Sequence, residues 1–365
     1  MALEFGLARS GDDAALRDLL RRTGMPGEIE LAFLREPSFF VAARAGNRET
    51  QTIVCRDLEA GELVGLGERG IRAAYVDGEP AALGYLSNLR GAVEWRKGLG
   101  LARGYEYLRA LHGDGRVRFY VTTILEDNAE AIALLTSGRA RLPRYEHVGT
   151  LITYLLPIHR RLRARSTAAE PVRAGGLADA VACLDVWNRR HQFAPVYTHE
   201  DLAAASGLLP DFTLDDLYVV REGGRIRGTL GVWDQSGYKQ TVVSSYSRRL
   251  ARVRRLYNAY AAVRGIPGLP AAGSQLRLLH GAFLSANDDD DATVEALVDR
   301  ALVDWSGRGF SYLVLALAEG HPLSETLSRH AARRLASRVY AVYWPDEGVP
   351  AFDRERPLHL EVATL

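Results

Sequence analysis

The chain has 365 residues, 47% hydrophobic and 25% charged, a composition that excludes a disordered protein, a collagen and a coiled-coil rod. With 46 basic and 45 acidic residues, the net charge is +1, so no overall field draws the chain to nucleic acid or an anionic membrane. Two distant cysteines, Cys55 and Cys183, exclude a disulfide framework. We expect a cytoplasmic protein that binds neither nucleic acid nor a membrane.

Two further features of the composition agree with this expectation. No apolar run is long enough to span a membrane, and the sequence begins without the pattern of a signal peptide. Among the basic residues only Lys97 and Lys239 are lysines, and alanine, glycine and leucine are abundant. This bias is typical of a GC-rich bacterial genome.

The first part of the chain predicts alternating strands and helices. After an apolar run at residues 3–8, Ser10 followed by Asp13 predicts a helix with Ser10 as its N-cap. Apolar runs then predict strands at residues 39–43, 50–56, 71–76 and 82–89. A helix near 100–111, a strand at 117–124, a helix at 128–137 and strands up to residue 156 complete this part.

A polar, basic segment at residues 158–170 separates this part from a second one, as an interdomain linker does. The second part predicts a helix at 177–190 and strands at 217–221, 226–232, 241–247 and 275–284, with Gly223 and Gly224 in a tight hairpin turn. A helix at 292–306, a strand at 312–318, a helix at 322–337 and strands at 339–343 and 358–363 follow.

Residues 248–264 predict a basic helix with Leu256, Tyr260 and Val263 on one side. We expect this apolar stripe to pack on the second sheet, with the arginines in water. A membrane-surface or nucleic-acid helix is the alternative.

The two parts repeat one order of elements: strand, helix, a meander of strands, then alternating helix and strand. This order predicts an α/β fold with a mixed sheet and helices on both faces, built from a duplicated domain. We place the N-terminal domain at residues 1–157, the linker at 158–170 and the C-terminal domain at 171–365.

Residues 83–108 carry the most informative motif. A strand ends near Leu89, and Lys97, Gly98 and Gly100 then precede a helix. Glycines at such a turn let backbone N–H groups approach an anion, and the helix N-terminus adds partial positive charge. The spacing fits neither a Walker loop nor a Rossmann turn.

This stretch resembles the CoA-binding motif of the GNAT superfamily of N-acyltransferases. Two registers fit: Lys97-x-x-Gly100-x-Ala102 with lysine in the place of arginine, or Arg96 in its usual role with a loop one residue shorter. Asn128, Ala131 and Leu134 resemble a second family motif that lies near the thioester. The resemblance implies a tandem GNAT fold and acetyl-CoA as co-substrate. It implies CoA-binding residues Leu89, Arg90, Gly91, Arg96, Lys97, Gly98, Leu99, Gly100, Leu101, Ala102 and Asn128. Asn128 also fits an N-cap.

The second part departs from the motif, because Asp288–Asp291 stand where glycines and arginines are expected. Carboxylates there favour the helix dipole but repel a pyrophosphate. We therefore expect a degenerate C-terminal domain without CoA. The spacing does not fit an EF-hand, and we predict no metal site.

The resemblance implies an acetyl-CoA-dependent N-acyltransferase that transfers the acetyl group to an amine by direct attack on the thioester. The catalytic groups remain open, with Glu126 and Tyr145 as weak candidates for the proton-transferring residues. A tyrosine that family members use as acid would fall at Leu135, and the strand before the motif lacks an acid. The alternative is therefore a non-catalytic CoA-binding or ligand-sensing protein. The acceptor, a small-molecule or peptide amine, and a homo-oligomeric state stay open.

Overall fold

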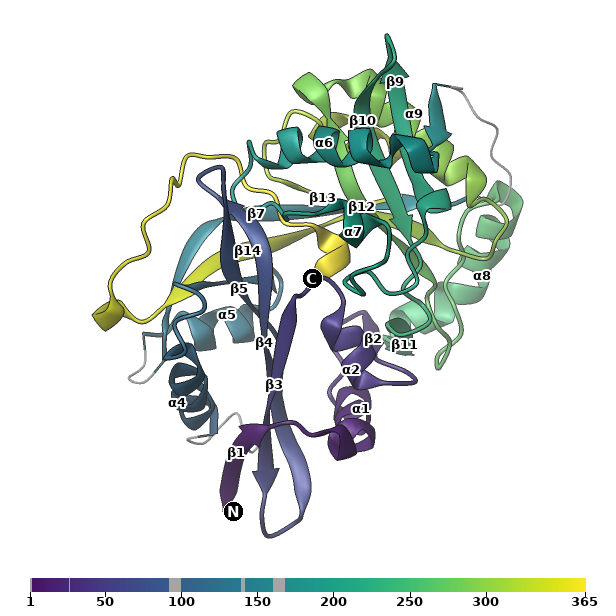
Figure 1. Ribbon diagram of the computed structural model, residues 1–365. Coiled ribbons are helices and arrows are strands. Elements are labelled where there is room, and N and C mark those ends of the chain that lie inside the picture. Colours follow the sequence, from purple (N-terminus) through teal and green to yellow (C-terminus); the bar gives the residue numbers. More distant parts are fainter. Residues whose placement is uncertain (1, 26, 92–99, 139–141, 160–167) are drawn as a thin grey trace.

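One mixed sheet runs through the whole molecule. The computed structural model describes residues 2–25, 27–91, 100–138, 142–159 and 168–365 (Figure 1). Within these residues the sheet has 12 strands. In spatial order they are β1 (Leu3–Leu7), β3 (Glu49–Asp57), β4 (Glu62–Val76), β5 (Glu79–Gly91), β6 (Tyr120–Leu125), β14 (Arg333–Tyr343), β7 (Arg144–Pro157), β13 (Tyr312–Ala318), β12 (Leu278–Ala286), β10 (Arg225–Trp233), β9 (Leu217–Glu222) and β8 (Ala169–Pro171).

Helices cover both faces of this sheet. In the N-terminal half, α1 (Asp13–Arg22) and α2 (Phe39–Arg44) share one apolar core with the sheet, and α4 (Gly100–His112) and α5 (Ala129–Leu135) share another. In the C-terminal half, α6 (Leu177–Asn188) and α7 (His199–Leu202) pack in one core, and α9 (Asp291–Asp304) and α10 (Ser324–His330) in another. The α/β class with a mixed sheet is therefore confirmed.

The two halves exchange their last strands. β14 belongs by sequence to the C-terminal half but pairs with β6, and β7 belongs to the N-terminal half but pairs with β13. β14 and β7 then pair with each other, from Arg333 opposite Leu155 to Tyr343 opposite Arg144. The assignment of domains to residues 1–157 and 171–365 stays a prediction, and the sheet itself is continuous across both.

A second, small sheet also joins the halves. It consists of β2 (Ile29–Leu34) and β11 (Gln240–Tyr246), which pair antiparallel. Helix α8 (Arg248–Arg264) follows β11 directly and has the predicted bounds. No helix in the described part of the chain has the length and apolarity that a membrane crossing requires.

Each half contains the same local irregularity. β5 and β6 are parallel but pair only at Gly84–Tyr85, and β12 and β13 are parallel but pair only at Leu278–His280. Beyond these residues the strands diverge. Each first strand then carries a bulge with a residue at positive φ, Asn88 at 51° and Phe283 at 56°. The repeated geometry supports the duplication inferred from the order of elements.

The wedge between β12 and β13 is filled by the chain itself. The turn Val362–Thr364 packs on both strands, and the Glu361 carboxylate accepts hydrogen bonds from the Phe283 amide at 2.7 Å and the Tyr197 hydroxyl at 2.6 Å. Burial raises the pKa of Glu361 to about 7.

The four aspartates near this wedge serve the fold. Asp290 accepts a hydrogen bond from the Thr293 amide and so caps α9. Asp288 pairs with Arg227. Asp289 accepts from the Trp187 indole, and Asp291 accepts from the Thr326 hydroxyl. No group of His, Cys, Asp or Glu within the described ranges has a geometry that could hold a metal ion.

Four predicted elements differ from the structure. Residues 39–43 form helix α2 and not a strand, because the Asp13 carboxylate accepts from the Phe39 amide and so caps that helix. Ser10 is not the N-cap of α1, which begins at Asp13 after a 3₁₀ turn. The predicted helix 322–337 ends at His330, since β14 starts at Arg333. Residues 358–363 form no strand but enter the C-terminal wedge.

Gly84 and Gly281 are required by the close approach of the parallel strands. A Cβ at Gly84 would meet the Tyr120 ring and lie 3.0 Å from the Phe119 carbonyl oxygen, and one at Gly281 would meet Leu315. We predict that Gly84→Ala and Gly281→Ala each lower the free energy of unfolding by about 1–3 kcal/mol, measured by urea denaturation. Gly6→Ala is the matched control, because its Cβ would contact nothing within 4 Å. Equal stability of all three variants would contradict this account of the junctions.

Candidate active site

The N-terminal wedge is open, unlike its C-terminal counterpart. From Leu86 to Gly91, β5 pairs with β4 on one edge, and no described strand pairs with its other edge. The Thr122 hydroxyl donates to the Leu86 carbonyl at 2.7 Å at the point where the strands separate. A strand edge without a partner strand presents backbone N–H and C=O groups with which an extended ligand can form main-chain hydrogen bonds.

The bulge in β5 fixes the side chains at the wedge. Asn88 and Leu89 together face Gly67 of β4, so Asn88 turns its amide to the Glu68 carboxylate at 2.6 Å. Glu68 is buried and also accepts two hydrogen bonds from Arg35, at 2.6 and 2.8 Å. Burial alone would raise the pKa of Glu68, but the charge and hydrogen bonds of Arg35 and the Asn88 bond lower it below its ordinary value. Glu68 therefore stays ionised and anchors the bulge.

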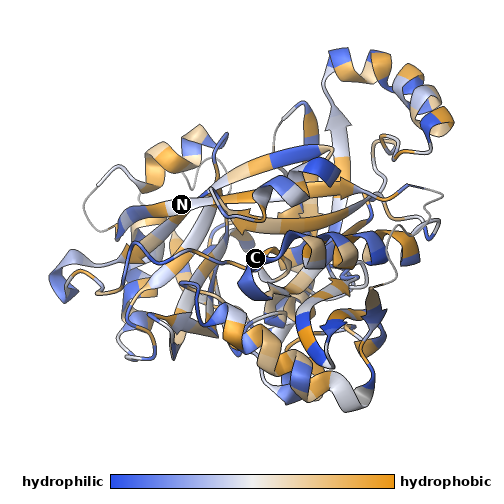
Figure 2. Cartoon of the chain, turned by 90° about the horizontal axis from the view of Figure 1, so that it is seen from above, coloured by the Kyte–Doolittle hydropathy of each residue, from blue (hydrophilic) through white to orange (hydrophobic). Residues whose placement is uncertain are grey.

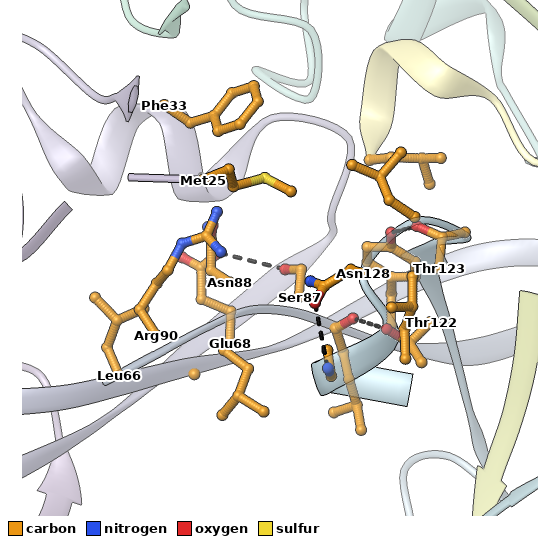
Figure 3. Close-up of a pocket in the computed structure, with 18 of the residues that line it drawn as sticks. Met25, Phe33, Leu66, Glu68, Ser87, Asn88, Arg90, Thr122, Thr123 and Asn128 are labelled. Atoms are coloured by element: carbon orange, nitrogen blue, oxygen red, sulfur yellow. Dashed lines mark hydrogen bonds between the residues drawn. The ribbon is translucent and has the colours of Figure 1, made fainter. Parts of the chain in front are cut away.

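A cavity of about 530 Å³ lies at this wedge and reaches both halves of the chain (Figure 3). Its floor is apolar and is formed by side chains of β3, β5, β6, β7, α4 and α5. The residues of this floor are Ile53, Cys55, Leu86, Leu101, Tyr105, Leu108, Ile124, Ala131, Leu135 and Tyr145. An apolar floor of this kind suits a ligand with an apolar chain, because the chain is removed from water when it binds there.

The small sheet of β2 and β11 forms the roof of the cavity, with Met25 and Phe33 from one side and Lys239 and Thr241 from the other. Gln240, the first residue of β11, also holds the segment that follows β2, because its side-chain amide accepts from the Glu36 amide at 3.0 Å and donates to the Glu36 carbonyl at 2.9 Å. The cavity is therefore completed only when both halves of the chain are in place.

Positive charge exceeds negative charge around the cavity. Arg35 is neutralised by Glu68, but Arg90, at the end of β5, forms no ion pair in the part of the chain that the structure describes. Burial and the charge of Arg35 lower the pKa of Arg90, which nevertheless remains a cation. A guanidinium in this position favours an anionic group of a ligand.

Lys239 and His280 face the cavity from the C-terminal half. Burial, followed by the charge of Arg35, lowers the pKa of Lys239 to about 7. Burial, reinforced by the charge of Lys239, lowers the pKa of His280 to about 3, and its buried Nδ1 has no hydrogen-bond partner within the described residues. At neutral pH the cavity thus contains a neutral imidazole and a lysine that readily exchanges its proton.

The structure brings together some of the CoA-binding residues predicted from the sequence. Leu89, Arg90, Leu101 and Asn128 line the cavity, Gly91 ends β5 and Gly100 begins α4, whereas Ala102 lies on α4 away from the cavity. Arg96, Lys97, Gly98 and Leu99 lie outside the described residues. Asn128 caps α5 by accepting from the Ala131 amide at 3.2 Å, as its position predicts. The binding role of these residues stays a prediction.

The two weak catalytic candidates have different surroundings. Glu126 is exposed, lies outside the cavity lining and forms an ion pair with Arg338 at 3.2 Å. Tyr145 lines the cavity and its hydroxyl is hydrogen-bonded to that of Tyr105. Burial, with the neighbouring Tyr105, raises the pKa of Tyr145 well above its ordinary value, so Tyr145 stays protonated at neutral pH.

Sequence reasoning missed Arg35, Glu68, Lys239 and His280. Two signals were present: Glu68 is a charge inside a strand whose neighbours are mostly apolar, and Lys239 is one of only two lysines in a chain rich in arginine. Lysine can exchange a proton near neutral pH when burial lowers its pKa, whereas the pKa of arginine stays too high for this.

The lysine content also permits a direct measurement. In the variant Lys97→Arg, Lys239 is the sole side-chain amine. We predict that the Lys239 ¹³Cε resonance of this variant titrates with a pKa of about 7, well below the ordinary lysine value of 10.5, because burial disfavours the charged form. A midpoint near 10.5 would place Lys239 in water and contradict the closed roof.

Comparisons with known proteins support the fold. No family model matches the chain, and no curated protein matches it in sequence. Among solved structures, N-myristoyltransferase from Saccharomyces cerevisiae with bound myristoyl-CoA aligns with a TM-score of 0.64 at 12% identity, covering 100% of this chain and 89% of that one. A GCN5-related glucosamine N-acetyltransferase region of a fungal multi-domain β-N-acetylglucosaminidase aligns at 0.58 and 13% identity, covering 93% of this chain and 38% of that one.

A further match is a probable N-acyltransferase from Enterococcus faecalis V583, with a TM-score of 0.50 and 11% identity, covering 93% of this chain and 72% of that one. At such identities the likeness concerns the fold. The chain therefore has a tandem GNAT fold, as its sequence motifs imply.

Proposed function

We propose that this protein is an acyl-CoA-dependent N-acyltransferase. The observation that carries the proposal is the open β5–β6 wedge above an apolar cavity. The free edge of β5 suits the amides of a pantetheine arm, and the start of α4 at Gly100 suits a pyrophosphate, because a helix N-terminus favours anions. Arg90, which lines the same cavity as the first turn of α4, adds a full positive charge.

The reaction that fits this arrangement is direct transfer. A neutral amine attacks the thioester carbon, the new C–N bond forms, and the C–S bond breaks with CoA leaving as the thiolate. The proton that the amine loses passes through the base to this thiolate and gives the thiol. The amine must lose a proton in the process, and Lys239 has the pKa nearest to neutrality among the cavity groups. We assign proton uptake to neutral Lys239, which faces the cavity from the C-terminal half. An amine-bearing small molecule or peptide is the acceptor.

The acyl group that fits the cavity is longer than acetyl. An acetyl group occupies a small part of about 530 Å³, and the floor beneath the wedge is apolar from Leu86 to Cys55. The structural neighbour with bound myristoyl-CoA uses a long-chain donor on the same fold. We therefore propose that acetyl-CoA, the donor that the sequence motifs imply, is the shortest of several acyl-CoA donors that the protein accepts.

Donor length is tested by CoA release from acetyl-, octanoyl- and myristoyl-CoA with a panel of amine acceptors. We predict that kcat/KM for the long donors exceeds that for acetyl-CoA by about tenfold or more, since each buried methylene contributes about 0.8 kcal/mol. Cys55→Phe fills the floor, and we predict about a tenfold loss for the long donors only. The acetyl-CoA rate of the same variant is the control for folding.

Two outcomes would change the assignment. If the enzyme prefers acetyl-CoA, the assignment of a long-chain donor is wrong and acetyl-CoA is the donor. CoA binding without turnover for any donor or acceptor would favour the non-catalytic CoA-binding protein, consistent with Leu135 at the place of the expected tyrosine.

The filled second wedge predicts the binding stoichiometry. We predict one CoA per chain in titration calorimetry, because Glu361 already occupies the Phe283 amide and the turn Val362–Thr364 fills the space beside it. Two equivalent CoA molecules per chain would show that the C-terminal wedge opens and that the second domain is functional.

A further inference from the structure

Helix α8 stands away from the main sheet. Figure 2 shows it projecting from the body beyond the strand that leads into it. It is fastened to the segment that follows it: Arg254 donates to the Pro270 carbonyl at 2.9 Å, and Asn258 exchanges two hydrogen bonds with Leu269 at 2.8 and 2.9 Å. The face with Leu250, Tyr257 and Ala261 is therefore turned inward. The expectation that Leu256, Tyr260 and Val263 pack on the second sheet is wrong.

An apolar stripe runs along the exposed side of α8. Val253, Leu256, Tyr260 and Val263 are 47%, 76%, 53% and 86% exposed. Their spacings of three, four and three residues place them on one side of the helix. An exposed apolar stripe of this size is costly in water and indicates a contact surface.

Positive charge accompanies the stripe. Arg248, Arg249, Arg252, Arg255 and Arg264 are exposed, and the helix contains no acidic residue. None of these arginines forms an ion pair with a carboxylate in the described part of the chain, although many arginines elsewhere do. Because the whole chain is almost neutral, this charge is local to α8.

We propose that α8 docks on the surface of an anionic lipid bilayer. A helix with an apolar stripe and arginines beside it lies in the interface, with the stripe in the acyl region and the guanidinium groups at the headgroups. Nucleic acid would satisfy the arginines but leave Leu256 and Val263 in water. A second copy packed symmetrically on the stripe would bring like-charged arginines together.

The docked helix is joined to the roof of the cavity. α8 begins two residues after β11 ends at Tyr246, and Thr241 of β11 lines the cavity. Lipid binding therefore places the roof beside the membrane. The inference rests on α8 alone and does not depend on the proposed acyl transfer.

Vesicle co-sedimentation of the full chain tests the proposal. We expect binding to vesicles of equal parts phosphatidylglycerol and phosphatidylcholine, weak binding to phosphatidylcholine alone, and release by high salt. The double variant Leu256→Ser, Val263→Ser and the triple variant Arg249→Gln, Arg252→Gln, Arg255→Gln should each bind about tenfold more weakly or worse. The matched control is Leu58→Ser, Val349→Ser, which changes two exposed apolar residues elsewhere and should bind like the native chain.

Three results would overturn the proposal. The first is an absence of binding to the anionic vesicles by the native chain. The second is equal vesicle binding by the α8 variants and the native chain, with unchanged circular dichroism. The third is a different partner for α8: the native chain forms a dimer in size-exclusion chromatography or a nucleic-acid complex in a gel-shift assay. The α8 variants then lose this complex but still bind vesicles.

Discussion

Strand β14 leaves the C-terminal half and enters the sheet between β6 and β7, and this insertion joins the two halves. It pairs with β7 from Arg333 to Tyr343 and with β6 from Ser337 to Val342, so both of its edges are satisfied by the N-terminal half. Its side chains Tyr340 and Val342 belong to the core under α4. The floor of the cavity therefore depends on a strand that is synthesised almost last.

The roof of the cavity also depends on both halves of the chain. β11, from the C-terminal half, pairs with β2, from the N-terminal half, and together they cover the open wedge. The roof thus combines strands of both halves and the floor packs against β14, so the site exists only in the assembled chain. This explains why the charged groups of the site, Glu68 and Lys239, lie far apart in sequence but influence each other's pKa.

Local patterns in the sequence predicted local features well. The bounds of α8, the hairpin turn at Gly223–Gly224 and the parallel strand-helix units follow from periodicity and turn residues that act over a few positions. The partners of β7 and β14 are set by contacts distant in sequence, about which periodicity carries no information. Residues 39–43 show the same limit, because their helix depends on the Asp13 cap, which lies 26 residues away. For the site, Leu89, Arg90, Leu101 and Asn128, which the sequence motifs named, line the cavity. The roof could not be predicted, since it needs two strands from different halves.

The two wedges differ in what lies between their diverging strands. Diverging strands expose backbone N–H and C=O groups that must find partners. In the C-terminal half, the Glu361 carboxylate takes the Phe283 amide, and the turn after it fills the space between the strands. From the sequence, we expected Asp288–Asp291 to repel a pyrophosphate. In the structure, Asp290 caps α9 and Asp289 accepts a hydrogen bond from the Trp187 indole. In the C-terminal half, the chain itself therefore occupies the space between the strands. In the N-terminal half the corresponding space is the cavity at Asn88 and Leu89, so the polar groups on the free edge of β5 remain for a ligand to satisfy.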